Sequence, residues 1–163
     1  YHGGVMKLDV SCNLICELSQ AKKVVKTLGL LNYVAAPIMK FESVERIGGQ
    51  EVLEPRAYVM KMKLFGVLSI GLHTMDFSYE EAHGFFIMRD NGHSDLCKRW
   101  DHTMIFTTGA NGVNYRDCAD IKAGLLTPLV WLFAVYFYKH RQRRWRCLVK
   151  QSFQALNMGS EAA

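Results

Sequence analysis

His102 and Asp117 are the two residues whose types and spacing best suit chemistry. His102 lies in an alternating stretch over 98–108, and Asp117 lies in the stretch 113–122, which follows a short glycine-flanked connection. Strands joined by short turns pair antiparallel, so both side chains are expected on one face of a sheet. A carboxylate that binds an imidazole fixes its tautomer and raises its basicity, which suits proton abstraction beside a carbonyl. The alternative is a satisfied buried pair that anchors a ligand head group or holds the sheet together.

The elements that must position this pair follow from the hydrophobic pattern. Between residues 56 and 64, Tyr58, Met60 and Met62 share one face while Lys61 and Lys63 share the other, which indicates a half-buried strand. Ser19 is expected to cap a first short helix, and Gly29 is expected to end it. Strands are predicted over 7–17, 38–47, 56–64, 68–79, 85–90, 98–108 and 113–122, short helices over 19–28 and 30–36, and one long helix over 124–156.

This order of elements predicts a single α+β domain over residues 6–157. Consecutive strands with short turns form antiparallel meanders, and only the last helix is long enough to cover one face of a seven-stranded sheet. The glycine-containing turn at 91–94 and the turn at 80–84 are expected to separate strands. Residues 1–5 are expected to be a cloning remnant or a disordered start.

Composition excludes several classes of protein. Half of the 163 residues are hydrophobic, which is enough to build a core without disulfides or metal. The five cysteines form no CxxC pair and do not indicate a disulfide framework, so a reducing, cytoplasmic setting is expected. His93, Cys97 and His102 fit no zinc spacing, and no phosphate-binding loop is present, so neither metal nor cofactor is expected.

The inward faces of the predicted strands are rich in methionine and aromatic residues. Such side chains form either an ordinary packed core or the walls of a small-molecule pocket. His73 and Arg89 are weaker candidates for contacting a polar head group. The predicted pocket residues are Tyr58, Met60, Met62, His73, Met75, Phe77, Trp100, His102, Met104, Phe106, Tyr115, Asp117, Phe133 and Phe137.

Several motifs resemble those of a known superfamily. They are the run 86–90 ending in Asp90, the Trp100-Asp101-His102 triplet, and the stretch 112–117 followed by a long helix. This pattern resembles the START/pollen-allergen (SRPBCC) superfamily, in particular its polyketide cyclase/dehydrase-like branch. Val113 and Ile121 depart from it, standing where threonine and tyrosine are common. The resemblance implies a helix-grip fold with a deep cavity for a lipid, quinone or polyketide-like ligand.

The last helix combines an uncharged run over 123–138 with a basic run over 139–146. The uncharged run is too short for a typical membrane span, and its first half is apolar all round. One side is expected to meet the pocket, and the other a second subunit, as in a homodimer, or a membrane surface contacted by Trp131 and the Arg141–Arg146 region. No nucleic-acid-binding motif is present.

These observations lead to one principal function and two alternatives. The chain is expected to bind or transport a hydrophobic small molecule in a cavity between sheet and last helix. The first alternative is a polyketide cyclase or dehydratase that uses His102 and Asp117 as an acid–base pair. The second alternative is a protein that associates with a membrane surface through its last helix.

Overall fold

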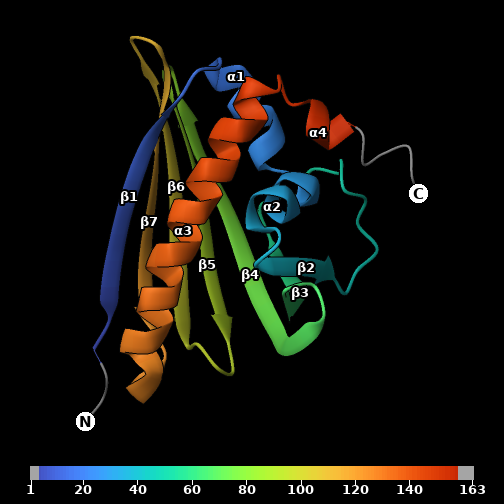
Figure 1. Cartoon of the computed structure of the whole chain (residues 1–163), viewed down its shortest axis with the longest axis vertical. Coiled ribbons are helices and arrows are strands. Elements are labelled where there is room, and N and C mark those ends of the chain that lie inside the picture. Colours follow the sequence, from blue (N-terminus) through green and yellow to red (C-terminus); the bar gives the residue numbers. More distant parts are fainter. Residues whose placement is uncertain (1–3, 158–163) are drawn as a thin grey trace.

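The computed structural model describes residues 4–157, which form one sheet covered on one face by helices (Figure 1). The seven antiparallel strands follow the order β1-β7-β6-β5-β4-β3-β2. The strands are β1 (Met6–Leu14), β2 (Met39–Ser43), β3 (Ala57–Leu64), β4 (Leu68–Ala82), β5 (Phe85–Ser94), β6 (Arg99–Gly109) and β7 (Gly112–Lys122). The helices are α1 (Leu18–Val25), α2 (Leu28–Ala35), the 3-10 turn η1 (Gly124–Leu126), α3 (Thr127–Lys150) and α4 (Gln154–Asn157).

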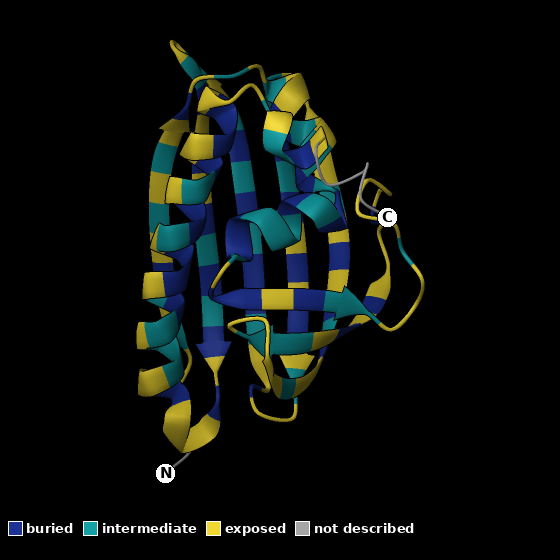
Figure 2. Ribbon diagram, turned by 45° about the vertical axis from the view of Figure 1, so that its right-hand side comes forward, coloured by how far each residue is buried: buried dark blue, intermediate teal, exposed yellow. Residues whose placement is uncertain are grey.

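The sheet bends strongly, so that β2 runs across the direction of β1 (Figure 1). Helix α3 lies along β1 and β7, while α1 and α2 cover the middle of the inner face. Buried and exposed residues alternate along the strands, as expected for a sheet with one covered face (Figure 2). The predicted α+β helix-grip architecture is therefore confirmed.

One predicted turn is strand, and another is shorter than predicted. β4 continues through Ala82, which leaves 83–84 as the turn within the predicted segment 80–84. β5 continues through Ser94, so the expected loop at 91–94 pairs with neighbouring strands. Gly92 suggested a turn, but it lies in regular register opposite Trp100, and a Cβ there would lie 2.5 Å from Nε2 of His73. The glycine makes room for the buried His73 ring. In the sequence alone, a glycine required for close packing cannot be told from a glycine required for a turn.

The helix boundaries also differ from those predicted. α1 begins with a capping box between Glu17 and Gln20, and Ser19 does not cap it. Gly29 does not end α1 but lies inside α2. Its N–H donates to the carbonyl of Gly49, and glycine is needed there because a Cβ would lie 2.7 Å from that oxygen. The long helix ends at Lys150, followed by two residues with positive φ, Ser152 and Phe153.

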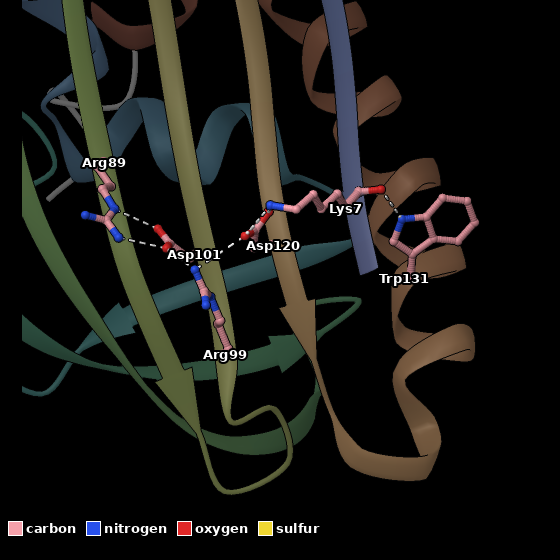
Figure 3. A network of polar contacts seen from close by, with 6 residues as sticks. All are labelled: Lys7, Arg89, Arg99, Asp101, Asp120 and Trp131. Carbon is pink, nitrogen blue, oxygen red and sulfur yellow. Dashed lines mark hydrogen bonds and ion pairs between the residues drawn. The ribbon is translucent and has the colours of Figure 1, made fainter. Parts of the chain in front are cut away.

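No helix among residues 4–157 is long and apolar enough to cross a bilayer. The uncharged run instead packs on this chain's own strands: Trp131 Nε1 donates to the carbonyl oxygen of Lys7 at 2.8 Å (Figure 3). Trp131 and Val135 are partly buried against a cluster that includes Leu8 and Ile121. This side of α3 is therefore covered by β1 and β7.

An ionic ladder crosses the outer face of the sheet, away from α3 (Figure 3). Arg89 of β5 makes two hydrogen bonds of 2.8 Å to Asp101 of β6. Arg99 joins Asp101 to Asp120 of β7, which in turn pairs with Lys7 of β1. Arg89, predicted as a head-group contact, therefore lies on the outer face and not in the interior.

We expect Asn32 to secure the edge strand β2 to α2. Its side-chain amide donates to the carbonyl of Phe41 at 2.9 Å and accepts from the Phe41 N–H at 2.7 Å. Removing both bonds in Asn32→Ala should lower the free energy of unfolding by about 2 kcal/mol, at about 1 kcal/mol per hydrogen bond. Urea unfolding measures this difference. Asn91→Ala, an exposed asparagine of β5, is the control; equal losses in both variants would contradict the assignment.

Candidate functional site

A cavity of about 720 Å³ lies on the inner face of the sheet, between α3, α2 and the strands β2 to β6. Its walls are almost entirely apolar, and its size falls in the range typical of small-molecule pockets. Many of the residues predicted from alternation contribute to the wall. These are Met62, His73, Met75, Phe77, Trp100, Met104, Phe133 and Phe137.

The other predicted pocket residues are buried but do not line this cavity: Tyr58, Met60, His102, Phe106, Tyr115 and Asp117. Phe106 and Tyr115 stack at 4.6 Å between ring centroids, and both rings pack against Trp145 of α3. The C-terminal half of α3 therefore fills the space above β6 and β7. Alternation identified the inner face of the sheet correctly. It could not distinguish the inner-face residues that α3 covers from those that line the cavity beside α3.

Asp117 is the centre of a buried polar cluster beneath α3. Its Oδ1 accepts hydrogen bonds from His102 Nε2 at 2.7 Å and from the Tyr115 hydroxyl at 2.6 Å. Its Oδ2 accepts from Gln142 Nε2 at 3.1 Å, and the same amide nitrogen donates to the Val10 carbonyl. Asp117 thus links β6, β7, α3 and β1, and the predicted contact between His102 and Asp117 is present.

The ionisation states of this pair follow from burial and hydrogen bonding. Burial lowers the pKa of His102, and this effect outweighs the neighbouring Asp117, which acts to raise it. Burial alone would raise the pKa of Asp117, but the bond from His102 and the positive charge of Arg141 hold it below its usual value. A neutral imidazole therefore donates to an ionised carboxylate.

Tyr138 separates this pair from the cavity. Its ring lies 4.5 Å from that of His102 between centroids, and it lines the cavity itself. The Tyr138 hydroxyl accepts a hydrogen bond of 2.8 Å from Trp100 Nε1. Because His102 is only 3% exposed and Asp117 is fully buried, the pair is placed to support the cavity wall rather than to contact a molecule inside it.

Arg141 belongs to the region predicted to contact a membrane surface, but its side chain lies inside the protein. It is only 5% exposed and lines the cavity. Phe137, Arg141 and Trp145 are spaced by four residues, which places all three on one face of α3. This spacing in the sequence indicates that Arg141 is buried, but the neighbouring arginines made the whole segment look like one basic surface. Arg144 is also engaged within the chain, donating to the Tyr33 carbonyl at 3.1 Å.

Asp90, like Arg141, lines the cavity although it was not among the predicted pocket residues. Its Oδ1 accepts a hydrogen bond of 3.0 Å from the N–H of Asp76, and its side chain lines the cavity. Burial raises the pKa of Asp90 well above its usual value, which favours the protonated carboxyl. Asp90 and Arg141, which interact electrostatically, therefore give the otherwise apolar wall a polar region, and His73 also lines the cavity.

Several solved structures share the fold of this chain. A START superfamily protein from Mycobacterium smegmatis superposes with a TM-score of 0.62 at 13% identity, over 91% of this chain and 99% of that chain. Ara h 8.0201 gives a TM-score of 0.63 at 10% identity, over 91% and 99%. This chain has the START-like fold.

A third structure with the START-like fold is that of an enzyme. Norcoclaurine synthase from Thalictrum flavum, solved in complex with dopamine and hydroxybenzaldehyde, gives a TM-score of 0.60 at 12% identity, over 90% of this chain and 87% of that chain. No family model matches the sequence, and no curated protein matches it either. The comparisons therefore establish the fold, and function must be argued from the cavity itself.

Proposed function

We propose that this chain binds a hydrophobic small molecule in the cavity between α3 and strands β2 to β6. The supporting observation is a preformed apolar space of about 720 Å³ in a domain of this size. Interiors normally pack to crystal-like density, so an unfilled space of this volume costs dispersion energy that a ligand would recover. Methionines in the wall, including Met62, Met75 and Met104, can adapt to ligands of irregular shape.

Binding without catalysis is favoured over the cyclase or dehydratase alternative. The proposed acid–base pair, His102 and Asp117, does not line the cavity, and Tyr138 lies between His102 and the space. A general base must come within hydrogen-bonding reach of the proton that it removes. The structural similarity to norcoclaurine synthase concerns the fold, and it supports a ligand cavity without assigning a reaction.

We expect a bulky residue at Met75 to weaken the binding of a neutral hydrophobic dye. Met75 lies on β4 in the cavity wall and is 4% exposed. Met75→Trp should raise the dissociation constant of N-phenyl-1-naphthylamine at least about tenfold, because the indole would occupy space that the dye needs. Fluorescence titration of the dye measures this change.

Leu72→Trp is the matched control, since Leu72 lies on the same strand and is 56% exposed. This variant should bind the dye as wild type does. If the wild-type protein does not bind the dye, or if both tryptophan variants bind it equally well, the cavity is not a binding site for neutral hydrophobic molecules.

A further inference from the structure

We propose that Arg141 binds the carboxylate of an amphipathic acid whose apolar body occupies the cavity. This inference rests on the proposed function and names the chemical class of its ligand. It starts from a permanent positive charge held inside an apolar space. Among the described residues that line the cavity, Arg141 is the single lysine or arginine.

The guanidinium of Arg141 has few partners within residues 4–157. Its Nε is buried without a hydrogen bond, and its Nη2 donates to Met104 Sδ at 3.6 Å, a weak acceptor. The Tyr115 hydroxyl, which gives its own proton to Asp117, can accept one further N–H of the guanidinium. A guanidinium has five N–H donors, so several lack an acceptor. Burying unsatisfied donors is costly, which suggests that a ligand supplies the missing acceptors.

The carboxylates near Arg141 do not take this role. Arg141 forms no ion pair with a carboxylate in the part of the chain that the structure describes, whereas Arg89 and Arg116 each bind an aspartate with two nitrogens. Asp117 is near enough to interact electrostatically, but three other donors occupy its oxygens. The charge of Arg141 is therefore partly balanced, and part of its hydrogen-bonding capacity, including Nε, remains free within residues 4–157.

The shape and charge of the site favour a monoanionic carboxylate. The planar guanidinium matches two carboxylate oxygens, and such charge-assisted bonds are among the strongest in proteins. A phosphate dianion would bring two negative charges to a single fixed positive one, close to Asp117. Asp90 also lies in the wall, and burial raises the pKa of its carboxyl, which is a second donor when it is protonated. The apolar remainder of the wall fits an alkyl or aromatic body.

The test compares decanoate with decan-1-ol, which share a chain and differ in head group. Each displaces N-phenyl-1-naphthylamine from the wild-type protein near neutral pH, below the concentration at which micelles form. We expect decanoate to bind about tenfold more tightly than the alcohol, because charge-assisted hydrogen bonds outweigh the cost of desolvating the carboxylate. Arg141→Met should remove this preference, while Arg143→Met, an exposed neighbour on α3, should retain it.

The dye separates the failure of this inference from the failure of the proposed function. If the wild-type protein binds the dye but shows no preference for decanoate, or if Arg141→Met keeps the preference, the carboxylate assignment is overturned and the cavity remains a binding site. If the dye does not bind, the proposed function itself fails. The wild-type comparison of acid with alcohol decides the question even if Arg141→Met does not fold.

Discussion

Replacing Asp117 by alanine is expected to cause the largest loss of stability of any single change in the polar cluster. The substitution leaves His102, Tyr115 and Gln142 without their shared acceptor, and it removes a negative charge that interacts with Arg141. A buried donor left without its acceptor typically costs about 1–3 kcal/mol, so the three donors together should cost about 3–5 kcal/mol, at the lower end of their summed range. For a domain of this length, that corresponds to a fall in melting temperature of roughly 6–20 °C.

Differential scanning calorimetry or circular dichroism melting measures this effect, with Asp120→Ala as the matched control. Asp120 lies on the same strand but on the outer face, where it pairs with Lys7 and Arg99. Surface ion pairs contribute roughly 0–1 kcal/mol, so the control should melt near the wild-type temperature. Similar losses in the two variants would show that the buried cluster has no special role in holding α3 against β1 and β7.

The sequence predicted the sheet and the His102–Asp117 contact because strand alternation is a local signal. Once 98–108 and 113–122 are recognised as strands joined by a short turn, the pairing is antiparallel and the inner face is fixed by parity. In the structure, Met104 lies opposite Asp117 and His102 lies opposite Ala119. The two side chains are thus diagonal neighbours on one face, a distance that an imidazole and a carboxylate can span.

The extent of the cavity could not be read from the same alternation. Phe106 and Met104 have the same parity on β6, yet Met104 lines the cavity while Phe106 packs against Trp145. The difference depends on where α3 crosses the sheet, and that is set by contacts between segments far apart in the chain, such as Gln142 with Val10. A local pattern contains no information about such a crossing.

Arg141 shows how composition can hide a site residue. Within the basic run, its charge suggested a contact with a membrane surface, whereas its spacing from Phe137 and Trp145 placed it on the buried face. Periodicity was the better guide, because a helix buries residues by their position around its axis and tolerates a charge there when function requires it. The polar region of the cavity could likewise be identified only from the structure, because it joins residues of β5 and α3 that lie far apart in the sequence.

His73 is expected to make the protein sensitive to acid. Its ring lines the cavity, and burial lowers its pKa to about 4, with the neighbouring His93 adding to the effect. In the unfolded chain a histidine has a pKa of about 6.5, so the unfolded state binds more protons at any pH between the two values. The free energy of unfolding therefore falls as the pH decreases from about 6.5 to about 4. This one residue should account for a loss of about 3 kcal/mol over that range.

Urea unfolding of wild type and His73→Gln across this pH range tests the expectation. Carboxylates titrate in the same window in both proteins, so the difference between the two curves isolates His73. The variant should lose about 3 kcal/mol less than wild type on acidification. His83→Gln, which removes the exposed imidazole in the turn between β4 and β5, keeps His73 and should therefore retain the wild-type acid loss. Parallel curves for wild type and His73→Gln would mean that His73 accepts a proton inside the folded protein, and that the cavity wall can hold a second positive charge in addition to that of Arg141.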